Sequence, residues 1–130
     1  SGQYIGEKNF TTLSIKSRLL SMTGKVAEAD ALMKEALSVG SMDEVLGYAG
    51  KLMAAKKTNE AADLFRTYYK KYPNQFGTNM GMVSALSSEG NFKEALKYAN
   101  AALKQAPNEG NKKNVESVIE KLKAGKSVNE

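Results

Sequence analysis

The sequence predicts an all-α protein assembled from repeated pairs of helices. Apolar residues recur at the spacing of a buried helix face along most of the chain, and both prolines fall where such a segment ends. Ala61 and Pro73 return as Ala95 and Pro107, at an offset of 34 residues. An earlier copy, which contains Ala29, lies two residues closer than that offset. A period of this length is typical of helical hairpins that stack into an array.

The first copy of the pattern follows a lead-in without helical periodicity. The residues from Phe10 to Met22 predict a helix of about three turns that stops at Gly24. A second helix begins at Val26 and ends at Gly40, which we expect to adopt a left-handed cap conformation. We expect one domain, divided into a lead-in, three hairpins, a capping helix and a frayed tail: residues 1–9, 10–41, 42–75, 76–109, 110–125 and 126–130.

Polar residues mark where later helices begin. Ser41, with Glu44 three residues further on, predicts a capping box at the start of the third helix. Asn91 and Glu94 predict the same arrangement at the start of the sixth helix. A last helix is expected over about residues 111–124, with one apolar and one polar face, so it would cover the exposed end of the array.

The composition excludes several classes of function. The 130 residues include no cysteine and no histidine, which removes thiolate catalysis, zinc–sulfur sites and the commonest general base. No glycine-rich phosphate loop, metal-ligand spacing or nucleophile–base pair occurs in the sequence. We therefore expect no enzyme, no cofactor and no metal site. No apolar run approaches the roughly 20 residues of a membrane span.

The net charge of +5 is placed unevenly along the chain. A basic stretch interleaves Arg66 and Lys70 with tyrosines, a pattern that also occurs where proteins stack on single-stranded nucleic acid. However, Phe65, Tyr68 and Tyr69 recur at helical spacing on the predicted buried face. This register favours core packing, so we expect no nucleic-acid partner.

The residues of the repeat resemble the tetratricopeptide repeat consensus. A small or modest side chain stands where the first helix of each hairpin crosses the second, and an alanine stands at the matching place in the second helix: Ser17, Ala49 and Val83, then Ala29, Ala61 and Ala95. The resemblance implies a right-handed superhelical array of three hairpins plus a C-terminal capping helix. Lys16, Tyr68 and Asn79 depart from the consensus side chains at their positions.

The same resemblance implies a protein-interaction scaffold that binds a peptide or helix in a concave groove. In that family the first helix of each hairpin lines the groove, which here corresponds to Arg18, Met22, Leu46, Gly50, Met53, Met80, Ser84 and Ser87. Family members that clamp chaperone C-terminal tails use lysine and asparagine at positions held here by Ser14, Arg18 and Gly47, so chaperone tails are not an expected partner. The alternative function is a structural spacer or dimerisation element without an external ligand.

Four glycines along the expected groove helices need a reason, because each costs a helix interior about 0.5–1 kcal/mol relative to alanine. They are Gly47, Gly50, Gly77 and Gly81. Close packing between hairpins is the favoured reason for Gly47 and Gly81. For Gly50 and Gly77 the alternatives of close packing and of close approach by a ligand stay open.

A narrower resemblance concerns four short motifs. Gly6-Glu7-Lys8-Asn9-Phe10, Ala27-Glu28-Ala29-Asp30-Ala31-Leu32-Met33, Gly40-Ser41-Met42 and Pro73-Asn74-Gln75-Phe76 are similar to the C-terminal repeat region of bacterial proteins predicted to be exported, whose N-terminal domain is β-rich and of unknown function. This likeness implies a periplasmic or exported protein. It also implies that the chain, which begins at Ser1-Gly2 without methionine, is a fragment whose upstream domain is a candidate ligand.

Overall fold

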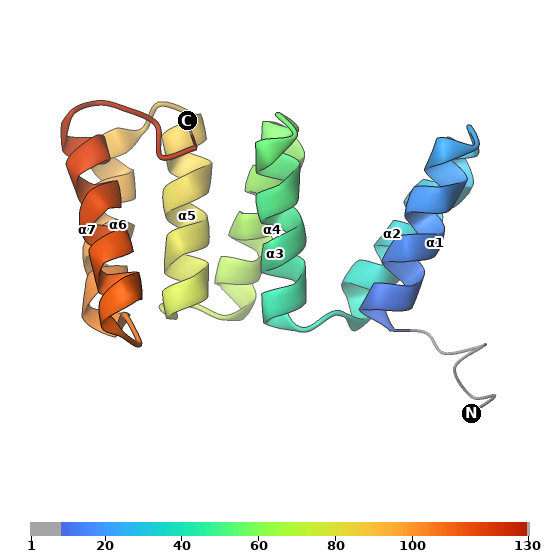
Figure 1. The fold of residues 1–130 in the computed structure, drawn as a ribbon, viewed down its shortest axis with the longest axis horizontal. Helices are drawn as coiled ribbons and strands as arrows, with labels where there is room; N and C mark the ends of the chain where they lie inside the picture. Colours follow the sequence, from blue (N-terminus) through green and yellow to red (C-terminus); the bar gives the residue numbers. More distant parts are fainter. Residues whose placement is uncertain (1–8, 130) are drawn as a thin grey trace. The chain divides into compact units, whose positions relative to one another are not determined.

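The computed structural model describes residues 9–129, so the predicted lead-in up to residue 8, and Glu130, lie outside the described residues. This part of the chain is all-helical and contains seven helices and no strand (Figure 1). The helices are α1 (Phe10–Met22), α2 (Val26–Val39), α3 (Met42–Ala54), α4 (Thr58–Lys71), α5 (Phe76–Ser88), α6 (Phe92–Gln105) and α7 (Glu109–Lys123). The prediction of an all-α fold is confirmed.

The chain divides into an N-terminal unit, Ser1–Val45, and a C-terminal unit, Leu46–Glu130, with the boundary inside α3. In the N-terminal unit, α1 and α2 form a hairpin that buries Leu13 and Ala29. The Ser17 hydroxyl is also buried and donates a 2.6 Å hydrogen bond to the carbonyl of Ala29. A small polar side chain at this crossing therefore lets the two backbones approach and satisfies its own hydroxyl.

Gly40 differs from its predicted role. The expectation was a left-handed cap, but its φ of −75° and ψ of 149° are those of extended backbone. A side chain at this position would meet Phe10 Cδ1 at 2.9 Å and Val45 Cγ2 at 3.1 Å. Gly40 is thus required by the close packing of two apolar side chains around the chain and not by a positive φ.

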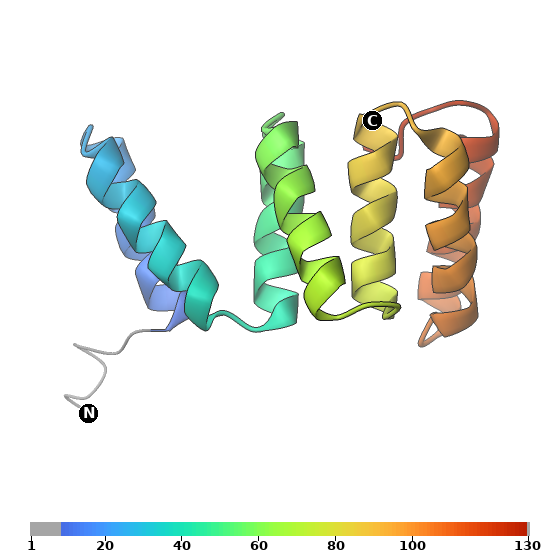
Figure 2. The ribbon, with the colours of Figure 1, turned by 180° about the vertical axis from the view of Figure 1, so that it is seen from behind.

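The C-terminal unit is built in two layers. The part of α3 in this unit, α5 and α7 lie in one layer, and α4 and α6 cover them from behind (Figures 1 and 2). Two core clusters hold the layers together. The first core cluster consists of Ala49, Leu52, Met53, Ala61, Ala62, Phe65 and Ala85. The second consists of Met82, Val83, Leu86, Ala95, Ala99, Ala102, Val115, Ile119 and Leu122.

The aromatic residues of α4 belong to this core. Phe65 and Tyr68 are buried, and Tyr69 packs on the second core cluster with its ring edge-to-face with that of Tyr98, at 5.3 Å between centroids. The interpretation of these residues as core rather than as a nucleic-acid stacking surface is confirmed. The basic residue Lys71 lies over the rings of Tyr68 and Tyr72, 5.5 Å from each centroid.

A polar cluster replaces the apolar side chain that the consensus has near the start of α5. Asn79 is 1% exposed and donates hydrogen bonds to Asn74 Oδ1 at 3.2 Å and to Gln105 Oε1 at 2.8 Å. Gln105 in turn donates to the carbonyl of Asn74 at 2.7 Å. These three side chains therefore join the turn before α5 to the last turn of α6, and each amide has a partner.

Of the two predicted helix caps, one is confirmed and the other is wrong. The capping box is confirmed at α3, where the Glu44 N–H donates to Ser41 Oγ and the Ser41 N–H donates to Glu44. The prediction for Asn91 is wrong, because its side chain makes no capping hydrogen bond. Asn91 has a ψ of 67°, whereas Asn9 and Asn108, whose side chains do cap their helices, have ψ near 170°. The backbone of Asn91 is held in the turn by its own N–H, which donates to Leu86.

The turns inside the hairpins need one residue with positive φ, and only two of the three have glycine there. Gly24 and Gly90 have φ of 86° and 79°, and the equivalent residue between α3 and α4 is Lys56, with φ of 68°. A residue with a Cβ atom is strained in this region.

We expect Lys56→Gly to raise the free energy of unfolding by about 0.5–1 kcal/mol, because relief of this strain exceeds the added entropy of the unfolded chain. Chemical denaturation monitored by circular dichroism measures the change. Lys57→Gly is the matched control, since Lys57 has an ordinary φ of −90°, and it is expected to lower stability. An equal loss of stability in both variants would contradict the strain at Lys56.

Candidate functional site

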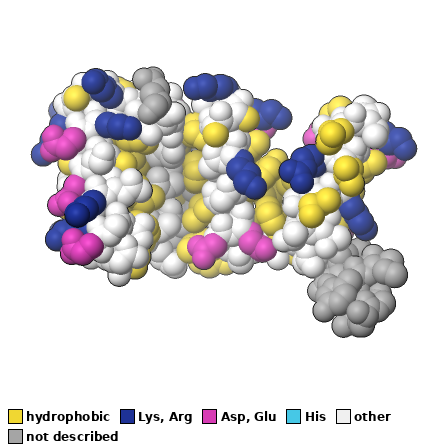
Figure 3. Space-filling view, in the orientation of Figure 1, with side chains coloured by type: hydrophobic (Ala, Val, Ile, Leu, Met, Phe, Trp, Pro, Cys, Tyr) yellow, Lys and Arg dark blue, Asp and Glu magenta, His cyan; other side chains and the backbone are white. Residues whose placement is uncertain are grey.

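The surface that best fits a binding site lies along α5, which contains no charged residue. Met80, Ser84, Ser87 and Ser88 are separated by the intervals of one helix face. Figure 3 shows the strip over α5 as uncharged surface between charged side chains of α7 and of α3. Three of these four residues are serines, so the strip offers hydroxyl groups and little bulk.

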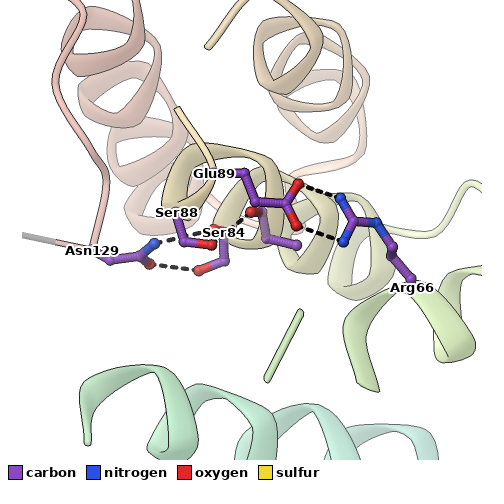
Figure 4. A network of polar contacts seen from close by, with 6 residues as sticks. Arg66, Ser84, Ser88, Glu89 and Asn129 are labelled. Atoms are coloured by element: carbon purple, nitrogen blue, oxygen red, sulfur yellow. Dashed lines mark hydrogen bonds and ion pairs between the residues drawn. The ribbon is translucent and has the colours of Figure 1, made fainter. Parts of the chain in front are cut away.

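The segment that follows α7 lies against this face. We name residues 126–129 the return segment, because the chain turns at Gly125, with φ of 72°, and comes back to the C-terminal half of α5 (Figures 1 and 2). Asn129 accepts a 2.7 Å hydrogen bond from Ser84 Oγ, and its Nδ2 donates to the Ser84 carbonyl at 3.1 Å (Figure 4). The described part of the expected frayed tail is therefore docked on the helix.

The middle of the return segment is held by Ser87. The Val128 N–H donates to Ser87 Oγ at 2.9 Å, and the Ser87 and Ser127 hydroxyls are 3.2 Å apart. The Val128 side chain packs on the second core cluster. Ser87 is only 2% exposed, and its hydroxyl makes hydrogen bonds with two residues of the segment, Ser127 and Val128. One aliphatic side chain and a set of polar contacts thus hold the segment.

An ion pair fixes the adjacent end of α5. Both terminal nitrogens of the Arg66 guanidinium, Nη1 and Nη2, donate to the carboxylate of Glu89, with 2.7 Å between Nη1 and Oε2 (Figure 4). Arg66 lies on α4, and Glu89 directly follows the last residue of α5. This hydrogen bonding lowers the pKa of Glu89 and raises that of Arg66. Because both side chains are about two-fifths exposed, the pair adds little stability, and its clearest effect is to orient the helix end.

The predicted groove residues fall into different environments. In the N-terminal unit, Arg18 is exposed and Met22 is 77% exposed. In the C-terminal unit, Leu46 is half-buried against the first core cluster and Gly50 is exposed. Met53 differs from the expectation of an accessible side chain, since it is 5% exposed and belongs to that core cluster. Its flexible thioether fills the core beside α4, so it is not offered to a ligand.

On α5, the structure brings Met80, Ser84 and Ser87 onto one face, as the groove prediction requires. Met80 is half-buried on the second core cluster, and both serines contact the return segment. Ser127, Val128 and Asn129 were not among the predicted site residues. Residues 127–129 belong to no helix or strand and carry no periodicity, so the only signal was the glycine before them.

The glycines separate into two groups. A Cβ atom on Gly81 would lie 2.6 Å from Phe65 Cδ1, which confirms close packing as its reason. Within the C-terminal unit, a Cβ atom on Gly47 or Gly50 would meet nothing within 4 Å. Packing inside this unit therefore does not account for Gly47, contrary to the prediction, nor for Gly50.

Residues 9–129 contain no group of three or more carboxylates arranged to hold a metal ion. Over the same residues, every helix is too short or too polar to cross a membrane.

Comparison with known proteins agrees with this architecture. A tetratricopeptide repeat family model matches residues 52–117, which is just over half of the 130 residues. No curated protein and no solved structure matches the chain. Tetratricopeptide repeats generally mediate protein–protein interaction and act as non-catalytic scaffolds. The chain belongs to the tetratricopeptide repeat family.

Proposed function

We propose that this protein is an interaction scaffold that binds a peptide segment of another protein along the face of α5, with Gly50 of α3 as part of the same binding surface. The observation that carries the proposal is the return segment, because a piece of polypeptide lies on Ser84 and Ser87 through both backbone and side-chain hydrogen bonds. Family membership supports it, since stacked hairpins present their first helices to partners.

The glycine on α3 supports the same surface. Gly50 is exposed in the middle of a helix and meets no neighbour in its unit, although glycine there weakens the helix by about 0.5–1 kcal/mol relative to alanine. Close approach by a partner backbone is a reason for keeping glycine at such a position. In a right-handed superhelix of three hairpins, Gly50 would line the groove together with Met80 and Ser84.

The charge of the surface defines the partner in part. With no ionisable side chain on α5, a charged group brought onto the strip would lose hydration without gaining an opposite charge from that helix. The bound segment is therefore an uncharged one. The narrower likeness to exported bacterial proteins makes an upstream domain of the same polypeptide the first partner to test.

The test compares Gly50→Glu with Gly47→Glu in a calorimetric titration of a partner captured from cells of the source organism. We expect Gly50→Glu to weaken binding at least tenfold, because a charged side chain would then stand on the groove floor. Gly47→Glu is the matched control, since Gly47 is equally open at its Cβ but is not among the eight residues predicted to line the groove. Both variants should unfold at temperatures no lower than the wild type. Equal affinities of the two variants would contradict the proposal.

An alternative function, dimerisation, is favoured by one observation. The N-terminal unit exposes several large apolar side chains, among them Leu19 at 56% and Met22 at 77%. If the repeats were a dimerisation element, light scattering would give a dimer at low micromolar concentration, and Leu19→Glu would convert it to a monomer. The scaffold proposal predicts a monomer in both cases.

A further inference from the structure

The return segment is separate from the repeat fold that it contacts. The family match ends at residue 117, α7 ends at Lys123, and Gly125 then reverses the chain with a φ of 72°. The segment contacts α5 through the side chains of Ser127 and Asn129 and through the backbone N–H of Val128. Removal of the segment would leave the helices and the buried parts of both core clusters in place. The reason is that Val128 is the only residue of the segment that packs on a cluster.

The hydrogen bonds of Asn129 depend on the chemistry of its side chain. The carboxamide of Asn129 uses both of its ends, since its oxygen accepts from the Ser84 hydroxyl and its nitrogen donates to the Ser84 carbonyl. An aspartate could accept from the hydroxyl but would place a carboxylate oxygen against the carbonyl. A pair of this kind repels, so the site distinguishes the amide from the acid.

The other two residues are recognised through different groups. Val128 presents an aliphatic side chain to the second core cluster and its backbone N–H to Ser87 Oγ. Ser127 contributes a hydroxyl that lies 3.2 Å from the same oxygen. The Asn129 N–H donates back to Ser127 Oγ at 3.2 Å, so the three residues form a turn that presents hydroxyl, aliphatic and carboxamide side chains with no charge.

We infer that the return segment is an intramolecular ligand of the α5 face, and that the partner segment that displaces it carries the same chemistry, an uncharged serine–aliphatic–asparagine sequence. This inference rests on the proposed function and adds to it the kind of segment bound and a means of regulation. The segment covers Ser87, so a partner reaches that hydroxyl only when residues 127–129 leave it. Tethering gives the segment an effective concentration on the order of millimolar, against which a partner must compete.

The first part of the test asks whether Asn129 holds the segment. In the full chain, Asn129→Asp is compared with Asn114→Asp, which makes the same charge change at an exposed position of α7. Hydrogen exchange at the Val128 amide should be at least tenfold faster in Asn129→Asp and unchanged in Asn114→Asp. Unchanged exchange in both variants would overturn the inference, because the site would then not distinguish asparagine from aspartate at position 129.

The second part asks whether the face accepts the same chemistry from outside. A capped peptide with the sequence of residues 127–129 is titrated into each ¹⁵N-labelled chain, and the Ser84 and Ser87 amide shifts are followed. We expect the Asn129→Asp chain to bind it at least fivefold more tightly than the wild type, with Asn114→Asp equal to wild type. Adding Ser84→Ala to Asn129→Asp should abolish the gain.

Two results of the titration would overturn the inference. Equal affinity of the wild type and Asn129→Asp would show that the segment does not compete for the face. Absence of binding to either chain up to about 10 mM peptide, well above the tethered concentration, would show that the face does not take this chemistry. The proposed function is judged separately by the Gly50 variants, because Gly50 makes no contact with the return segment, so the two failures are distinguishable.

Discussion

Gly81→Ala is expected to lower the free energy of unfolding by about 1–3 kcal/mol, although alanine is the better helix former. The added Cβ atom would lie 2.6 Å from Cδ1 and 3.2 Å from Cγ of Phe65. Cγ is the fixed end of the ring, so a small rotation of the side chain does not relieve the clash. Phe65 is 5% exposed and packed among alanines of α3 and α4, and the helices themselves would have to move apart.

Chemical denaturation of three variants separates this clash from the helix propensity. Gly47→Ala introduces the same methyl group on α3, where nothing in the C-terminal unit meets it, and should raise stability by about 0.5–1 kcal/mol. In a Phe65→Leu background, Gly81→Ala should cost less than in the wild type, because the smaller side chain leaves room for the Cβ atom. An identical loss in both backgrounds would show that the Phe65 ring is not what the methyl group meets.

Asn79→Ala is expected to lower the free energy of unfolding by about 2–3 kcal/mol. The substitution removes two hydrogen bonds, one to Asn74 and one to Gln105, and leaves a cavity at a residue that is 1% exposed. Asn79→Leu restores the apolar character of the repeat consensus but leaves Gln105 without that donor. We therefore expect its stability to lie between those of the wild type and of Asn79→Ala.

Urea denaturation measures this loss, with Asn100→Ala as the control. Asn100 is exposed on α6, so its substitution should change the free energy of unfolding by less than about 0.5 kcal/mol. If Asn79→Ala were as mild as Asn100→Ala, the polar cluster would not be holding α5 to the end of α6.

Much of the fold could be predicted because the helices of a repeat place apolar residues at a regular spacing in the sequence. The first helix was expected from Phe10 to Met22, and α1 has these bounds. Local backbone choices were harder, because they depend on the turn as a whole. Gly40 was expected in a left-handed conformation, and the packing of Phe10 around it, which no periodicity shows, explains the glycine instead. Asn91 has a ψ of 67° at the end of its turn, and its side chain makes no cap hydrogen bond.

The candidate site was predictable only where it lies on a helix. Ser84 and Ser87 were placed on the groove face from their position in the repeat, and they do lie together on α5. Met53 was placed there from its equivalent position in the repeat, but its side chain is long enough to enter the core. The position in the repeat does not show whether a side chain of this length turns toward the core or toward the groove. The partner of the serines is a short non-helical segment far along the chain, joined to α5 by contacts that leave no pattern in the sequence.

The most direct test of the scaffold account is site-specific photo-crosslinking to a captured partner. A photoreactive phenylalanine analogue is placed at Ser88, on the α5 face, and separately at Lys97, which is exposed on α6 in the other layer. The account predicts a crosslink from position 88 and none from position 97. A crosslink from position 97 alone would contradict it, because the partner would then bind the outer layer and not the α5 face.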